Sequence, residues 1–245
     1  MAVQLSGGVN QVPEDMVTHA QQVWRAPSTA PTVDASQSAL LALSQTRLGY
    51  VTAKRLFDLI AALSGIAVCL PLWCVIALCI KLTSKGPVIF RQQRPGLGGA
   101  PFTILKFRTM VEDAEQRLAD VMHLNEEPTG SLIRIKQDPR QTRIGRFLRA
   151  TSLDETPQLI NVLLGQMSLV GPRPISRPLA DSRAPLRLRV MPGLTGLWQI
   201  SGRKDTGCAF MLDMDLQYIC KRSFLYDMWI ILQTVVVVVR GRGAR

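Results

Sequence analysis

The stretch LIAALSGIAVCLPLWCVIALCI, residues 59 to 80, is the longest run of the chain without a charged side chain. Its 22 residues would form a straight helix about 33 Å long, enough to cross a hydrocarbon core of about 30 Å. Pro71 lies near the middle and predicts a kink, because proline removes a backbone hydrogen bond. The stretch therefore predicts one membrane-embedded helix, which with its flanks takes in residues 52 to 84.

Positive charge lies on both sides of this helix, in the residues Lys54, Arg55, Lys81, Lys85, Arg91 and Arg94. A spanning helix usually has its Lys and Arg residues concentrated on the cytoplasmic side. Because neither flank has the character of an external one, the charges favour a re-entrant helix that bends at Pro71 and returns to the same leaflet. Asp58 at the entrance also fits headgroup depth better than the membrane interior. A kinked crossing stays open as the alternative.

Residues 1 to 46 precede the membrane helix and are rich in Gln, Ser, Thr, Ala, Val and Pro. They have no sustained apolar face, so we expect a flexible N-terminal tail. They also have no basic stretch followed by an apolar core, so a cleaved secretory signal is not expected.

The composition excludes several kinds of site. Two histidines in 245 residues argue against a Ser-His-Asp triad and against a histidine-rich metal centre. Five cysteines without a Cys-x-x-Cys pair argue against a disulfide framework.

The rest of the chain, residues 85 to 245, shows shorter patterns. Residues 87–94 and 101–109, joined by the glycine-rich turn PGLGGA, predict a β-hairpin in which Lys106 and Arg108 share a face. Helices are predicted at 111–124, from Thr156-Pro157 to Gly165, at 209–222 and at 224–239. The last has 12 consecutive uncharged residues, too few to span, so an interfacial or packed helix is expected. Together the patterns predict an α+β fold, mostly helical.

The charge of the chain is strongly positive, with a formal net value of +11. Five cations and no acid lie between Lys85 and Arg108, and six cations with one acid lie between Arg134 and Arg149. A nucleic-acid partner is disfavoured, because aromatic residues make up only 6% of a chain that carries a membrane segment. Anionic phospholipids and a phosphate-bearing substrate at the membrane face both stay open.

Two adjacent carboxylates, Asp154 and Glu155, lie in the sequence TSLDETP at the start of a predicted helix. Acids there can simply favour the helix dipole. Arg149 lies just upstream, however, and Arg173 follows between two prolines. A carboxylate kept ionised by such neighbours can act as a nucleophile toward phosphorus, provided that a cation such as Mg²⁺ screens the like charges.

The run TSLDETPQLINVLLGQMSLVGPRP, residues 151 to 174, resembles the signature of the bacterial sugar transferases, the monotopic phosphoglycosyl transferases. The resemblance covers residue 52 to the end, because further blocks match in the same order. These blocks are KRLFDLIAAL (54–63), GPVIFRQQRPG (86–96), FTILKFRTM (102–110), DPRQTRIGRFLR (138–149), PGLTGLWQISGR (192–203), DLQYI and SFLYDMWIIL.

The resemblance implies that Asp154 and Glu155 are the catalytic acid pair. Asp154 would attack the β-phosphorus of a UDP-sugar and form a covalent phosphosugar intermediate, with release of UMP. Polyprenyl (undecaprenyl) phosphate would then displace the aspartate. Asp154 would also contact Mg²⁺, with Glu155 in support.

The resemblance also implies phosphate-binding or substrate-binding roles for Arg149, Lys106 and Arg173, with Arg108 as a further candidate in the same block as Lys106. Each has a structural alternative: Lys106 and Arg108 could form a solvated strand face, and Arg173 could fix a loop. Asp213 and Asp215 are expected to be structural. The serine that precedes the family's helix-breaking proline is replaced here by Leu70.

The expected protein is thus a membrane-anchored monotopic enzyme at the cytoplasmic face of a bacterial inner membrane. It would catalyse the first membrane step of exopolysaccharide, capsule or O-antigen synthesis, among membrane phospholipids, with a homodimer as one possible state. One alternative is a non-catalytic lipid-binding or scaffold protein. Another is a transferase without a covalent intermediate, in which Asp154 only holds the metal.

Overall fold

The computed structural model describes residues 33–44, 48–126, 133, 135–176, 179, 181–201 and 207–240. Its longer helices are α2 (Val33–Ser44), α3 (Leu48–Thr83), α5 (Arg143–Ala150), α6 (Gln158–Leu163), α8 (Cys208–Lys221) and α9 (Phe224–Val239). The shorter ones are α4 (Leu118–Val121) and α7 (Leu197–Ile200). Two small sheets pair β1 (Ile89–Pro95) with β2 (Pro101–Phe107) and β3 (Ser168–Val170) with β4 (Gly193–Thr195). The mostly helical α+β prediction is confirmed.

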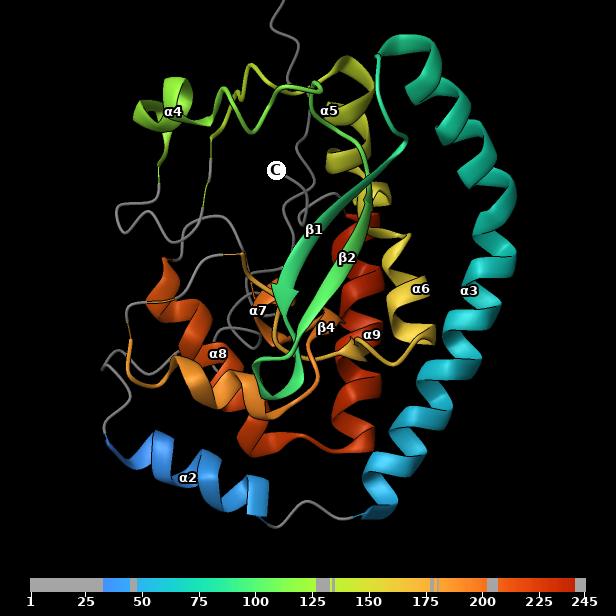
Figure 1. Ribbon diagram of the computed structural model, residues 1–245. Coiled ribbons are helices and arrows are strands. Elements are labelled where there is room, and N and C mark those ends of the chain that lie inside the picture. The colour runs from blue at the N-terminus through green and yellow to red at the C-terminus, as the bar shows by residue number, and fades with distance from the viewer. Residues whose placement is uncertain are drawn as a thin grey trace, which may run out of the picture.

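Helix α3 contains the apolar stretch and has 36 residues. It is long and apolar enough to cross a membrane, by length and composition. Large apolar side chains are exposed along it, among them Leu63, Val68 and Leu78. Figure 1 shows the helix curving along one side of the molecule, with α6 between it and the hairpin.

Helix α3 continues as one helix through Pro71, and the predicted kink there stays a prediction. Proline removes only the hydrogen bond to the carbonyl of Ala67, and the turns on either side preserve the helix. The re-entrant path stays a prediction.

Lys54, Arg55 and Asp58 near the start of α3 make polar contacts with the rest of the chain. Lys54 donates to Asp227 of α9 at 2.8 Å, and Arg55 donates to the carbonyls of Val162 and Leu163 at the end of α6. Asp58 accepts from the backbone N–H of Leu169 at 3.0 Å. Lys54 and Arg55 therefore hold the protein together, and their positions say less about membrane topology than the sequence pattern suggested.

The hairpin prediction is confirmed. Strands β1 and β2 are antiparallel, with Phe90 opposite Lys106 and Gln92 opposite Ile104. The side chains of Phe102 and Ile104 are buried against Ala62 of α3 and Leu159 of α6, so the hairpin covers a small apolar core. This packing fixes the side of the hairpin from which Lys106 projects.

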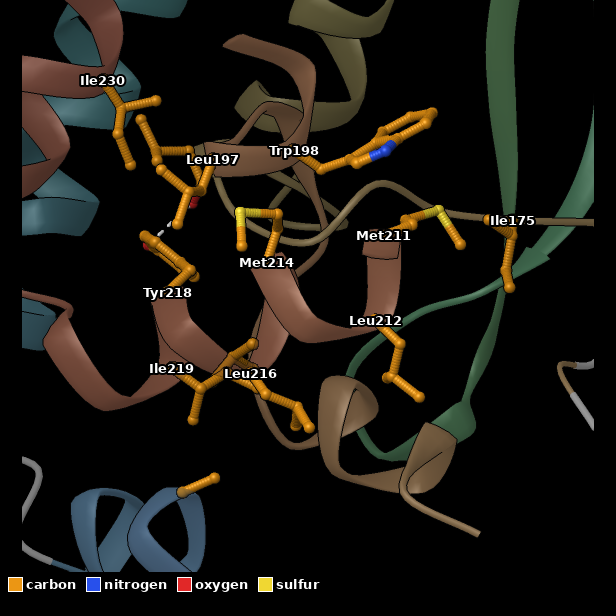
Figure 2. Close-up of a cluster of buried hydrophobic side chains, with 13 residues drawn as sticks. Ile175, Leu197, Trp198, Met211, Leu212, Met214, Leu216, Tyr218, Ile219 and Ile230 are labelled. Carbon is orange, nitrogen blue, oxygen red and sulfur yellow. Dashed lines mark hydrogen bonds between the residues drawn. The ribbon is translucent and has the colours of Figure 1, made fainter. Parts of the chain in front are cut away.

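A larger apolar core surrounds α8. Figure 2 shows side chains of α8, among them Met211, Leu216 and Ile219, packed with Leu197 and Trp198 of α7 and with Ile230 of α9. Ala39 of α2 is fully buried in the same cluster. The stretch Val33–Ser44 thus forms a packed helix, where the sequence led us to expect flexible tail; residues 1–32 lie outside the described part.

The single amphipathic helix predicted over residues 111–124 is wrong. Turns occupy most of its first half, and only α4 and a 3₁₀ turn at Met122–Leu124 follow. In an α-helix the carbonyl of Ala114 would accept from the N–H of Leu118. Here it accepts from the Arg140 guanidinium at 3.0 Å, and the Leu118 N–H turns to Glu115. The distant Arg140 therefore competes successfully with the helical pattern.

Candidate active site

The two acids lie in a short 3₁₀ turn, Leu153–Glu155, which we call the acid turn. Helix α5 precedes it and is capped by Thr142, whose hydroxyl accepts from the N–H of Gly145 at 2.9 Å. Ser152 between α5 and the turn has φ +58°, the one positive value of a non-glycine residue in the described part of the chain. Such a conformation costs energy and is typical of functional sites.

Glu155 brings three separate elements together. Its carboxylate accepts from Lys106 Nζ of β2 at 2.7 Å. It also accepts from both terminal nitrogens of Arg173, at 2.6 and 3.2 Å, in the loop after β3. Lys106 and Arg173, which the sequence placed in the site, therefore both contact Glu155. Lys106 is ion-paired and does not belong to a solvated strand face, whereas the loop-fixing alternative for Arg173 stays open.

Asp154 differs from its neighbour. Its side chain is buried, at 7% exposure, and it accepts no hydrogen bond from any residue that the structure describes. Burial, followed by the negative charge of Glu155, raises the pKa of Asp154 to about 6, although Lys106, Arg149 and Arg173 oppose the shift. At neutral pH the group is thus a partly desolvated, ionised carboxylate whose lone pairs no described residue occupies, which suits a nucleophile or a metal ligand.

Arg149 and Arg108 differ in burial from Lys106 and Arg173, the other cations of the predicted site. Arg149 is exposed at the end of α5 and lowers the pKa of Asp154 through its charge. Arg108 is buried away from the acid turn and donates to the backbone and side-chain oxygens of Ser84, at 2.9 and 2.8 Å. Strand β2 ends at Phe107, so the alternation that placed Arg108 beside Lys106 does not continue.

Arg94 was counted in the sequence only as one of several cations, but it lies next to Arg173. Its terminal nitrogens donate to Gln92 at 2.6 Å and to the carbonyl of Pro174 at 3.5 Å. Its Nε is buried and has no partner among the described residues, and it forms no ion pair with a described carboxylate. Burial, and then the charge of Arg173, lower the pKa of Arg94 to about 10. Arg94 is thus a partly desolvated cation beside Arg173 that no described carboxylate pairs with directly.

A buried ion pair contacts the backbone of Arg173. Arg187 donates to the carbonyl of Arg173 at 2.7 Å and to Asp215 of α8 at 2.6 and 3.0 Å. Asp213 also lies in an ion pair, since it accepts from Arg183, and the structural role expected for Asp213 and Asp215 stays a prediction. No signal in the sequence marked Arg187, because its partners are 14 and 28 positions away.

Asn161 plays a similar part for Lys106. Its side chain accepts from the N–H of Leu105 at 3.0 Å and donates to the carbonyl of Thr103 at 2.7 Å. Both of those residues belong to β2, and Asn161 belongs to α6, which begins just after the acid turn. The side chain therefore fixes the lysine-bearing strand relative to the acid turn, a role that an asparagine within LINVLL did not indicate.

The arrangement fits Mg²⁺ better than a tightly caged metal. No group of three or more His, Cys, Asp or Glu side chains that could hold a metal occurs within the described residues. Mg²⁺ does not need one, because it usually keeps several waters and binds one or two carboxylates together with substrate phosphates. The carboxylate of Asp154, which has no partner among the described residues, would be the ligand available to such an ion.

The protein thus has one long apolar helix. This helix is hydrogen-bonded to a site that contains carboxylates and cations. The sequence model described as "Bacterial sugar transferase" matches residues 49–241, so the chain belongs to the bacterial sugar transferase family. The resemblance inferred from the sequence is confirmed.

Named relatives agree with this assignment. The chain is 40% identical over 198 residues to the exopolysaccharide production protein ExoY of Rhizobium meliloti, covering 78% of this chain and 88% of the relative. It is 44% identical over 193 residues to a UDP-glucose:undecaprenyl-phosphate glucose-1-phosphate transferase of Caulobacter vibrioides, covering 74% and 68%. It is 39% identical over 200 residues to the undecaprenyl-phosphate galactose phosphotransferase of Salmonella typhimurium, covering 78% and 41%.

Proposed function

We propose that the protein transfers a sugar 1-phosphate from a UDP-sugar to undecaprenyl phosphate, as the first membrane step of exopolysaccharide, capsule or O-antigen synthesis. The names of the Caulobacter and Salmonella relatives describe transfer to this lipid carrier, and the name of the Rhizobium relative refers to exopolysaccharide. The observation that carries the mechanism is the buried carboxylate of Asp154, which accepts no hydrogen bond from the described residues, beside a Glu155 that two cations hold in place.

In the first step, an oxygen of the ionised Asp154 carboxylate bonds to the β-phosphorus of the donor. The bond from that phosphorus to the bridging oxygen breaks, and UMP leaves with this oxygen and the electron pair. Lys106 and Arg173 stabilise the charge that develops on the diphosphate, because Glu155 already holds them in position. The sugar phosphate is then attached to Asp154 as an acyl phosphate.

In the second step, a phosphate oxygen of undecaprenyl phosphate attacks the same phosphorus. The bond to Asp154 breaks, the carboxylate is regenerated, and the product is the undecaprenyl diphosphate sugar. Mg²⁺ bound at Asp154, with Glu155 in support, would screen the donor charges from the acid pair.

The acceptor requires a membrane, and the exposed apolar side chains of α3 provide the surface for one. We place the active site at the cytoplasmic face of a bacterial inner membrane, among phospholipids, where a soluble UDP-sugar and a lipid phosphate can both reach it. The apolar helix and the polar site together thus allow a water-soluble donor and a membrane acceptor to meet.

The proposal predicts that the purified protein releases UMP from one member of a UDP-sugar panel when Mg²⁺ and undecaprenyl phosphate are present. Removal of Mg²⁺ with EDTA should abolish the release, and added Mg²⁺ should restore it, because the donor charges otherwise repel the acid pair. Nucleotide chromatography measures the product. A lipid-binding scaffold would give no UMP with any donor.

A second prediction concerns Arg94. The Arg94→Gln variant should have a KM for the UDP-sugar raised by about 10-fold or more, since a hydrogen bond to a charged group is lost from the diphosphate site. The matched control is Arg91→Gln, which removes an exposed cation from the same strand. Steady-state kinetics compare the two. Equal KM values for both variants would show that Arg94 does not contact the donor.

A further inference from the structure

The membrane helix makes one direct hydrogen bond to the segment that carries the acids. Trp73, two residues after Pro71 in α3, donates from Nε1 to the hydroxyl of Thr156 at 2.9 Å. Thr156 follows Glu155 directly, and its own hydroxyl donates to the carbonyl of Leu153 at 2.8 Å. The three groups form a chain of two hydrogen bonds from the membrane helix to the backbone of the acid turn.

The acid turn needs such support. A single 3₁₀ turn is weakly stable by itself, because its hydrogen-bond geometry is poor. Its two backbone bonds, from the N–H groups of Glu155 and Thr156, are both 3.3 Å long. The side-chain bonds of Thr156 are shorter, and consecutive hydrogen bonds strengthen one another. The chain from Trp73 therefore adds to the contacts of Glu155 in fixing the position of the turn.

The same indole also touches the strand that carries Lys106. Its ring packs edge-on against Phe107, with the ring centres 6.2 Å apart, and Phe107 directly follows Lys106. Phe107 is buried with Ile76 and Ile80, which lie further along α3. One side chain of the membrane helix therefore contacts both elements that build the site, the acid turn by a hydrogen bond and β2 by ring packing.

We infer that Trp73 and Thr156 are positioning residues that fix the nucleophile relative to the membrane helix. The inference rests on the proposed function, in which Asp154 must meet first a soluble donor and then a lipid phosphate at the membrane. The bilayer determines the position of that lipid phosphate along the membrane normal. The helix embedded in the bilayer is hydrogen-bonded to the acid turn, so this bond fixes the position of Asp154 along the membrane normal relative to the same bilayer.

The test uses the full chain in lipid nanodiscs, with kcat and KM measured for the UDP-sugar that the wild-type protein accepts. Trp73→Phe removes the N–H and keeps a ring against Phe107, whereas Thr156→Val removes the hydroxyl and keeps the shape. Each should lower kcat by about 3- to 10-fold, the range expected for one hydrogen bond. KM should stay within twofold, because Glu155 still holds Lys106 and Arg173.

Two further variants distinguish positioning from general damage. Thr156→Ser keeps the hydroxyl and should restore kcat. The double variant Trp73→Phe, Thr156→Val should be no slower than Thr156→Val alone, since both changes break the same chain. Trp229→Phe is the control, because Trp229 stacks on Tyr226 of α9.

The inference is overturned if Trp73→Phe and Thr156→Val have the kcat of the Trp229→Phe control, or if Thr156→Ser is as slow as Thr156→Val. A rise of KM at unchanged kcat would also overturn it, since that result would assign the pair to donor binding. A wild-type protein that releases no UMP from any donor would contradict the proposed function itself.

Discussion

Asp154→Asn is expected to abolish UMP release, with a loss of at least about 1,000-fold, the scale seen when a covalent nucleophile is removed. An amide oxygen has no negative charge to donate to phosphorus and cannot form the acyl phosphate. The fold should survive, because burial raises the pKa of Asp154 to about 6 and thus penalises its charge. We therefore expect a thermal midpoint no lower than that of the wild type.

The matched control is Asp213→Asn, which neutralises an aspartate of α8 paired with Arg183 and should leave UMP release unchanged. Loss of activity alone does not separate a nucleophile from a metal ligand. Intact-protein mass spectrometry after incubation with donor alone does so, since the wild-type protein should gain the mass of one sugar phosphate. An Asp154→Asn variant that turns over normally, or a wild-type protein that never shows the adduct, would contradict the covalent mechanism.

The parts of the site that the sequence predicted are those carried by neighbouring residues or by a recognisable block. Asp154 and Glu155 are adjacent, and Lys106 and Arg173 lie in blocks that resemble a known family. Helix α9 has the predicted bounds, because an apolar run and a serine cap define both of its ends locally. These features depend on short-range patterns, which a single sequence contains.

The supporting contacts depend on distant partners and could not be predicted. Asn161 bonds to residues 56 and 58 positions away, and Trp73 bonds to a residue 83 positions away. Distant partners also caused the errors, since Arg140 takes the carbonyl of Ala114 that a helix over 111–124 would have used. The strand alternation that placed Arg108 beside Lys106 fails for a different reason, because strand β2 ends one residue before Arg108.

The second large effect is expected at Arg187. The Arg187→Met variant leaves the buried carboxylate of Asp215 without its partner, and should lower the free energy of unfolding by about 3–5 kcal/mol. For a chain of this length that corresponds to a fall in Tm on the order of 10 °C. Thermal unfolding of the detergent-solubilised protein measures it.

The pH dependence of this loss has a definite sign. Burial raises the pKa of Asp215 to about 6 even with Arg187 present, and removal of Arg187 should raise it further. A carboxyl whose pKa is higher in the folded than in the unfolded state favours folding when it is protonated. The deficit of Arg187→Met should therefore be smaller at pH 5.5 than at pH 8. A deficit independent of pH would mean that lost packing, and not the unpaired charge, is the cause.

A double variant separates stability from positioning. Arg187→Met with Asp215→Asn removes both buried charges and should recover most of the lost stability. It should not recover the affinity for the donor, because the carbonyl of Arg173 still lacks the hydrogen bond from Arg187. We expect KM for the UDP-sugar to stay raised in a protein that is again stable. A double variant with wild-type KM would show that Glu155 alone is sufficient to hold Arg173.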